Sequence, residues 1–264
     1  MGISSTLHDG GIRVVTMEFP PVNALPMSGW FDVAEALNEA SKDMDTHVVV
    51  LRAEGRGFNA GVDIKEMQTT SGFDALIGAN RGCYAAFKAV YECATPVVAT
   101  VHGFCLGGGM GLVGNADTIV ASDDAFFGVP EVDRGALGAA THLARMVPPH
   151  LMRTLYFTGR TITVQQLHHH GSVLEVVPRA ELDDAAMQVA GEIADKDTRV
   201  IRAAKEAING IDPVDVNRSY RFEQGFTMEL NLAGVADEYR DEFAGTSKVA
   251  ETEKAAPNEK ARSR

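Results

Sequence analysis

The segment FCLGGGMGLVGN, residues 104–115, follows PVVATVHG at 96–103, a run that is typical of a buried strand. Three consecutive glycines, followed by Gly111 and Gly114, suit neither a helix interior nor a strand. Because glycine costs stability inside regular elements, the pattern indicates that another group needs close access to this backbone. What approaches it is the first question that the sequence raises.

Two kinds of site use such a glycine-rich turn. Residues 109–114, GMGLVG, match the G-x-G-x-x-G pattern of dinucleotide-binding proteins. That site also needs a crossover helix before the next strand, yet the predicted strand DTIVASDD begins at 117, three residues after Gly114. The spacing argues against a nucleotide site.

The second kind is an oxyanion hole. Backbone N–H groups in the first turn of a helix lack partners within the helix and can stabilise negative charge on a carbonyl oxygen. A second glycine turn, NAGVD at 59–63, follows the predicted strand THVVVLRAE at 46–54 and would supply another donor. Either turn alone is explained by a simple reversal of the chain, but the pair predicts two backbone donors.

Length and composition limit the class of protein. The 264 residues carry a net charge of −12, which argues against a nucleic-acid partner because phosphate binding needs a basic face. Cys83, Cys93 and Cys105 show no framework or ligand spacing and predict reduced thiols in a cytoplasmic protein. We see no secretory leader and no apolar run of about 20 residues, so we expect no membrane contact.

Strand and helix patterns alternate up to about residue 138, and helical patterns dominate afterwards. This order predicts an α/β fold with a core over residues 1–195 and a C-terminal helical module over 196–246. Residues 247–264 are charged and poor in apolar side chains, which predicts a disordered tail.

Five segments form one pattern when they are taken in chain order. They are PPVNALP (20–26), GFNAGVDIKEM (57–67), HGFCLGGGMGL (102–112), ASDDAFFGVPEVDRGALG (121–138) and FEQGFTMELNLAGVADEYRD (222–241). This pattern resembles the crotonase, or enoyl-CoA hydratase/isomerase, superfamily over roughly residues 10–245. The resemblance implies a crotonase-like ββα spiral core with a helical C-terminal trimerisation module, in a homotrimer or a dimer of trimers. It also implies an acyl-CoA thioester as partner, with coenzyme A carried as part of the substrate and with no further cofactor or metal.

By this resemblance, the backbone amides of Val62 and Gly108 form the oxyanion hole. Val62 fills the variable position of A-G-x-D, so its amide rather than its side chain serves. Asp63, Ile64 and Lys65 follow on the loop that is expected to line the CoA moiety.

Hydratases of this family resemble one another in carrying two glutamates, one just after the glycine triplet and one in a P-E dipeptide. Here the first position is Gly111 and the second is Glu131, in GVPEVD. A single carboxylate predicts acid–base catalysis other than the two-glutamate hydration of a double bond. We expect the missing side chain at Gly111 to leave space for a substrate bulkier than a linear enoyl chain.

One branch of this family, the ring-opening hydrolases of bacterial steroid degradation, is resembled by four stretches: RGFNAGVDIKEMQ, GVPEVDRGALGAATHL, RVIRAAKEAIN and ELNLAGVADEYRD. That branch implies hydrolysis of a ring C–C bond in a bicyclic, indane-type CoA thioester by a retro-Claisen type reaction. Water attacks a ring ketone, the oxyanion hole accepts charge, and a general acid protonates carbon. Two alternatives stay open: an enoyl-CoA isomerase or atypical hydratase that uses Glu131 alone, and a non-catalytic acyl-CoA-binding scaffold.

Residues near Glu131 are further candidates. Asp133 would share its face if the segment were extended, and would then contact a catalytic water. Arg134 would bind a substrate carboxylate or ketone, or form an ion pair with Asp133 or Glu131. His142 begins a predicted helix, which favours a cap or a core position, and Lys205 is a candidate partner for CoA phosphates.

Overall fold

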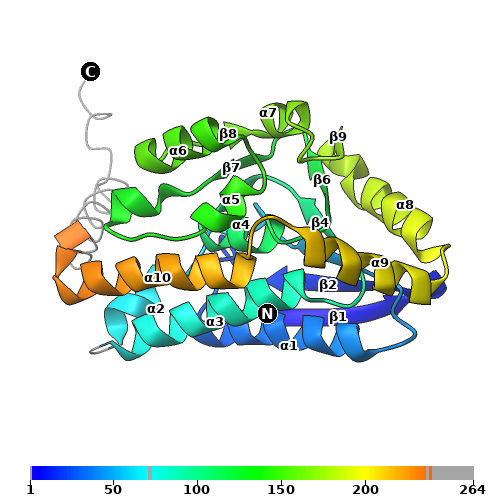
Figure 1. Cartoon of the computed structure of the whole chain (residues 1–264), viewed down its shortest axis with the longest axis horizontal. Helices are drawn as coiled ribbons and strands as arrows, with labels where there is room; N and C mark the ends of the chain where they lie inside the picture. Colours follow the sequence, from blue (N-terminus) through cyan, green and yellow to red (C-terminus); the bar gives the residue numbers. More distant parts are fainter. Residues whose placement is uncertain (1, 71–72, 236–237, 240–264) are drawn as a thin grey trace, which may run out of the picture.

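The apolar runs of the sequence become the middle strands of a six-stranded sheet in the computed structural model, which describes residues 2–70, 73–235 and 238–239 (Figure 1). The first two strands pair antiparallel, and all other neighbours in the sheet are parallel. In their order across the sheet, the strands are β1 (Gly2–His8), β2 (Ile12–Glu18), β3 (Val48–Ala53), β4 (Val97–Val101), β6 (Thr118–Ser122) and β9 (Glu175–Val177).

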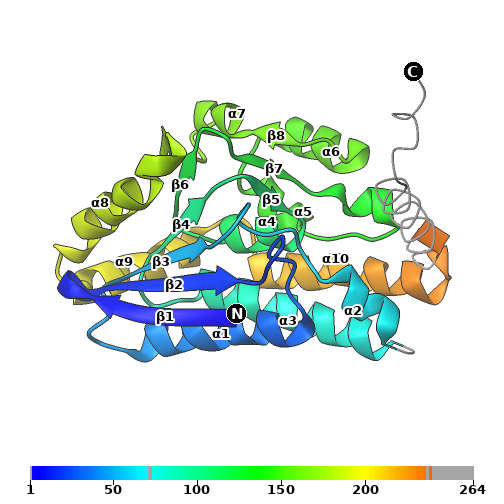
Figure 2. The same ribbon diagram turned by 180° about the vertical axis from the view of Figure 1, so that it is seen from behind.

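Helices cover both faces of this sheet, which explains why its central strands are apolar throughout (Figures 1 and 2). On one face lies α8 (Leu182–Ala194), and Val50 of β3 packs with it. On the other face lie α1 (Met27–Lys42) and α3 (Asp74–Tyr91), and the next side chain along, Val49, packs with them. Alternate residues of one strand therefore enter two separate apolar clusters.

A second, three-stranded sheet carries the glycine-rich segment. Its strands, in order, are β5 (Phe104–Leu106), β7 (Phe126–Gly128) and β8 (Ile162–Thr163). β5 is followed directly by α4 (Gly108–Val113), so the segment is a strand, a tight turn and a helix of six residues. β6 begins at Thr118, which leaves no crossover helix between the two and agrees with the argument against a nucleotide site.

The chain after β7 is mostly helical, as predicted. The remaining helices are α2 (Ile64–Thr69), α5 (Ala140–Ala144), α6 (Pro149–Thr158), α7 (Val164–His169), α9 (Thr198–Ile211) and α10 (Val216–Leu232), with short 3-10 turns η1 (Asp9–Gly11), η2 (Pro130–Arg134) and η3 (Arg179–Glu181). α10 packs on α3 and α5 of its own chain (Figure 1). The predicted tail at 247–264 lies outside the described residues.

The boundary that we predict at 195/196 falls between α8 and α9. The described helices include none with both the length and the apolar character needed to cross a bilayer. The assignment to the α/β class is confirmed, and the trimerisation role of the C-terminal helices stays a prediction.

Candidate active site

The two glycine turns meet, as the sequence predicts. A Cβ atom on Gly61 would lie in ordinary contact with the second turn, 3.4 Å from the backbone nitrogen of Gly108, so the two turns lie side by side. Gly61 also has a φ of +90°, which favours glycine. Within the described chain, the amides of Val62 and Gly108 donate no hydrogen bond to protein, so both remain available to a ligand oxygen.

A buried asparagine ties the turns together. The Asn59 side chain donates to the carbonyl of Asn23 over 2.6 Å and accepts from the amide of Gly61 over 2.8 Å. Its own carbonyl accepts from the amide of Leu106, in β5, over 2.9 Å. Asn59 is fully buried, so these contacts fix the relative position of the two donors. The sequence reasoning missed this role, although an asparagine just before a glycine turn is a recognisable signal.

The group that approaches the first glycine of the triplet is the carboxylate of Glu131. A Cβ on Gly107 would lie 2.6 Å from Oε1 of Glu131, and Gly107 has a φ of +56°. Glu131 lies in η2, which follows β7, and the amide of Gly107 donates to the carbonyl of Gly128 in that strand over 3.0 Å. The carboxylate thus lies against the same turn that presents the Gly108 amide, and its catalytic role stays a prediction.

The carboxyl group of Glu131 is poorly accessible to solvent. Its Oε2 is buried and has no hydrogen-bond partner among the described residues. Burial raises the pKa of Glu131 to about 8, with a further rise from the nearby charge of Glu223. The carboxyl group is therefore mostly protonated at neutral pH and is suited to donate a proton.

Gly108 and Gly111 face aromatic rings. A Cβ on Gly108 would lie 2.5 Å from Cη2 of Trp30, and a Cβ on Gly111 would lie 2.5 Å from Cε1 of Phe87 and still closer to other atoms of that ring. Phe87 is buried in the core, with its ring 5.7 Å from that of Trp30. The expectation that Gly111 leaves room for a bulky substrate is therefore wrong, because Phe87 already fills that space.

The residues that are predicted to line the CoA moiety follow Val62 directly. Asp63 caps α2, because its side chain accepts from the amide of Lys65 over 2.9 Å. Ile64 is half-buried and Lys65 is exposed at the start of that helix. Their contact with CoA stays a prediction.

The residues after Glu131 do not form the extended segment in which Asp133 would share its face. Because η2 is a 3-10 helix, side chains two positions apart point in different directions. Asp133 is exposed, and its carboxylate lies against Gly159 at the end of α6. Arg134 is half-buried. Catalytic roles for Asp133 and Arg134 stay predictions. The expectation that Asp133 shares a face with Glu131 is wrong.

His142 lies in the core, as favoured from the sequence. It is fully buried in α5, with its ring 4.9 Å from that of Phe87 and 5.0 Å from that of Tyr220. Burial, with a smaller contribution from nearby Arg145, lowers the pKa of His142 to about 3, so the imidazole is neutral. It packs as an aromatic ring.

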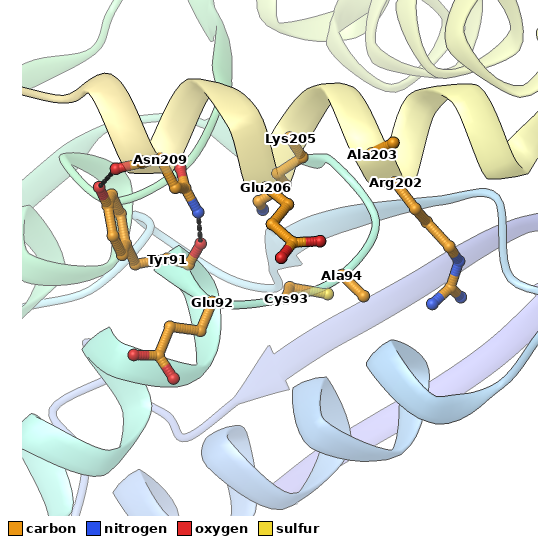
Figure 3. Close-up of a pocket in the computed structure, with 10 residues that line it drawn as sticks. Tyr91, Glu92, Cys93, Ala94, Arg202, Ala203, Lys205, Glu206 and Asn209 are labelled. Atoms are coloured by element: carbon orange, nitrogen blue, oxygen red, sulfur yellow. Dashed lines mark hydrogen bonds between the residues drawn. The ribbon is translucent and has the colours of Figure 1, made fainter.

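The prediction that Lys205 binds CoA phosphates is wrong. Its Nζ is buried and donates to the Asp117 carboxylate over 2.7 Å and to the carbonyls of Thr95 and Val90 over 3.2 and 3.4 Å. All three donors of the ammonium group are used inside the protein. Lys205 borders a pocket of about 550 Å³ between α9 and the chain at 91–94, and none of our predicted catalytic, oxyanion or CoA-lining residues lines this pocket (Figure 3).

A second buried carboxylate lies near Glu131 and was not predicted. Glu223 comes from α10, is 9% exposed, and accepts a hydrogen bond from the Tyr156 hydroxyl over 2.7 Å. Burial raises its pKa above the ordinary value. The motif around 222–241 marked this segment, but no local spacing relates Glu223 to Glu131.

In the described part of the chain, no group of three or more His, Cys, Asp or Glu side chains could hold a metal ion. Comparison with known proteins gives a consistent picture. The sequence model of a family described as enoyl-CoA hydratase/isomerase matches residues 8–236.

Two curated relatives cover nearly the whole chain. A protein of Rhodococcus jostii (strain RHA1), named (7aS)-7a-methyl-1,5-dioxo-2,3,5,6,7,7a-hexahydro-1H-indene-carboxyl-CoA hydrolase, is 70% identical over 94% of this chain and 96% of its own length. A protein of the same name from Mycobacterium tuberculosis (strain ATCC 25618 / H37Rv) is 67% identical over 94% of this chain and 100% of its own length. A solved enoyl-CoA hydratase/isomerase from Xanthobacter autotrophicus Py2 shares the fold, with a TM-score of 0.81 at 24% identity over 91% of this chain and 97% of that one.

Proposed function

This chain belongs to the enoyl-CoA hydratase/isomerase family, and we propose that it is an enzyme that hydrolyses a ring C–C bond of a bicyclic, steroid-derived acyl-CoA thioester. One observation carries the proposal: the buried carboxylate of Glu131 meets the turn that presents the Gly108 amide. The relatives at 70% and 67% identity, named as hydrolases of a hexahydro-indene-carboxyl-CoA, support the bicyclic substrate.

The amides of Val62 and Gly108 are suited to bind the thioester oxygen. Neither amide donates to an acceptor among the described residues, and Asn59 fixes the turns that present them. Such donors stabilise the negative charge that develops when a carbanion delocalises onto a thioester oxygen. Asp63, Ile64 and Lys65, next to Val62, would then contact the CoA moiety.

Glu131 supplies the proton. The oxygen of water bonds to the carbon of a ring ketone, and the adjacent ring C–C bond breaks, leaving its electron pair on the departing carbon. That pair delocalises through the conjugated enone to the thioester oxygen. Glu131 gives its proton to carbon and regains one from the attacking water, so the products are a carboxylic acid and a C–H bond. Protonation of Glu131 at neutral pH favours this order.

This reaction is redox-neutral and needs no organic cofactor beyond the CoA of the substrate. We also propose a homotrimer or a dimer of trimers in the cytoplasm. Exposed apolar side chains on the last two helices support self-association: Ile208, Ile211, Phe222 and Leu232. Size-exclusion chromatography with light scattering measures the subunit number.

Product mass tests the function. Incubation with indane-type bicyclic CoA esters is expected to give a ring-opened product heavier by one water. Replacement of Glu131 by glutamine is expected to lower the rate by about 10²- to 10⁴-fold, since it removes the transferable proton. Turnover of a 3-enoyl-CoA with no mass change on bicyclic esters would instead support an isomerase. Binding of every ester without turnover would support a scaffold.

A further inference from the structure

The C-terminal helix α10 reaches the active site of its own chain through a turn at 137–140. This turn lies against Glu131, because a Cβ on Gly138 would lie 3.6 Å from both Cγ and Oε1 of that residue. The turn also contains Ala139, a non-glycine residue with a φ of +62°. A backbone in this strained conformation persists only where its surroundings hold it.

Glu223 holds the C-terminal end of the turn, at Ala140. Both oxygens of its carboxylate accept from the amide of Ala140, the first residue of α5, over 3.1 and 3.2 Å. Ala139, at the cap position of α5, has no side chain that can do this, so Glu223 caps the helix from another element. The hydroxyl of Tyr156, which donates to Glu223, also accepts from the amide of Gly138 over 3.3 Å.

Thr227 holds the N-terminal end of the same turn, at Leu137. Its hydroxyl donates to the carbonyl of Leu137 over 2.8 Å and accepts from the amide of Leu137 over 3.3 Å. Glu223 and Thr227 are four residues apart on α10, so they lie on one face of the helix. That face therefore grips both ends of the turn that packs on Glu131.

We propose that Glu223 is a positioning residue for Glu131, acting through the turn at 137–140 and through the negative charge that it presents to the site. The inference rests on the proposed function, since it assumes that Glu131 is the proton donor. It assigns α10 a part in building the active site, in addition to any role between subunits.

The charge of Glu223 acts on Glu131 directly. Among the described residues, the titratable groups that interact electrostatically with Glu131 include Cys83 from α3, Tyr156 from α6, and Tyr220 and Glu223 from α10. Burial raises the pKa of Cys83 and of both tyrosines, so these three groups stay neutral at neutral pH. Glu223 is the member of this set that gains a negative charge at the lowest ordinary pKa, and a like charge on it raises the pKa of Glu131.

A titration that needs no substrate tests this role. Carboxyl-carbon NMR of protein labelled in its glutamates follows each group, and the Glu131→Gln variant identifies the Glu131 signal. We expect a midpoint of about 8 in the wild type. Glu223→Gln keeps the shape of the side chain and removes its ionisable group. It is expected to lower this midpoint by about one pH unit or more, because the loss of a like charge favours the ionised form of Glu131. The alkaline limb of the pH–activity profile should shift by the same amount.

Three variants separate charge from geometry. Thr227→Val removes both hydrogen bonds to Leu137 without changing the charge. Turnover should therefore fall about 10- to 100-fold, while the Glu131 midpoint stays unchanged. Thr227→Ser keeps the hydroxyl and should restore turnover. Glu229→Gln removes an exposed charge from the same helix and should change neither turnover nor the Glu131 midpoint.

An unchanged Glu131 midpoint in folded Glu223→Gln, with wild-type turnover, would overturn the proposal. If that variant does not fold, the threonine pair decides, and full turnover in Thr227→Val refutes the positioning role. Full turnover in Glu131→Gln refutes the proposed function instead, and the NMR midpoints still report whether Glu223 acts on Glu131.

Discussion

Replacing Gly111 by alanine tests whether Phe87 occupies the space that family hydratases give to a second glutamate. The new Cβ would lie 2.5 Å from Cε1 of Phe87 and closer to the rest of the ring, whereas ordinary contact begins at 3.4 Å. One of the two groups must move by about 1 Å or more, a displacement that well-packed cores resist.

Phe87 has little freedom to move. It is 2% exposed and its ring packs against those of Trp30, His142 and Tyr220, with centroids 5.7, 4.9 and 5.1 Å away. Overpacking of this kind costs about 1–3 kcal/mol. Alanine in place of glycine in a helix returns up to about 1 kcal/mol. We therefore expect Gly111→Ala to lower the free energy of unfolding by about 1–2 kcal/mol.

Urea and thermal unfolding at one protein concentration measure this loss. The matched control is Gly191→Ala in α8, where no atom lies within 4 Å of the new Cβ, and there we expect a gain of up to about 1 kcal/mol. Phe87→Leu removes the ring that clashes, so in that background Gly111→Ala should cost less than it does alone. The difference is a coupling energy of about 1–2 kcal/mol.

A Gly111→Ala variant that gains stability as Gly191→Ala does would refute this reasoning. So would additive effects of Gly111→Ala and Phe87→Leu. Either outcome would mean that the space beside Gly111 is open, as the sequence suggested, and that a substrate can enter it.

Other predictions follow from single contacts. Because the folded-state pKa of Glu131 is raised from 4.5 to about 8, the wild type should lose stability as pH rises through that interval. Glu131→Gln should therefore become more stable than the wild type by about 3–5 kcal/mol at pH 9 but not at pH 4, in urea unfolding. Lys205→Met should cost about 3 kcal/mol of stability and leave KM for a CoA ester unchanged, since it breaks a buried ion pair outside the site. Asn59→Ala should lower kcat by about 10- to 100-fold with a smaller change in KM, because the two oxyanion donors lose their fixed relative position. Steady-state kinetics measure both constants. Val62→Ala keeps the backbone amide and should retain activity.

Local signals predicted the parts of the fold that depend on local chemistry. The apolar runs became β3 and β4, and the two glycine turns came together as expected for donors of one site. β1 was not predicted, because it is an edge strand with mostly exposed side chains and lacks the alternation of a half-buried strand. A shared face for Asp133 and Glu131 required an extended segment after Pro130, yet the proline begins a 3-10 helix in which the two side chains point in different directions.

The partners that matter most at the site are distant in sequence. Gly111 meets Phe87 from another helix, and Glu223 holds the amide of Ala140 across 83 residues of chain. No periodicity or motif spacing encodes such contacts, because they depend on how complete helices pack. The empty position at Gly111 was therefore recognised correctly, while its occupant was not.

The glycine triplet joins the acid and the oxyanion donor in one turn. Without a Cβ on Gly107, Oε1 of Glu131 can lie against the backbone, and without one on Gly108 the Trp30 ring can pack beneath it. The turn thus brings together an amide with no acceptor among the described residues, a buried acid and an apolar floor, and burial raises the pKa of that acid. An enolate bound at that amide would carry its charge on oxygen beside the group that must protonate its carbon. Substituting either glycine should therefore disturb acid strength and charge stabilisation together, which neither Glu131→Gln nor a change at Val62 would do alone.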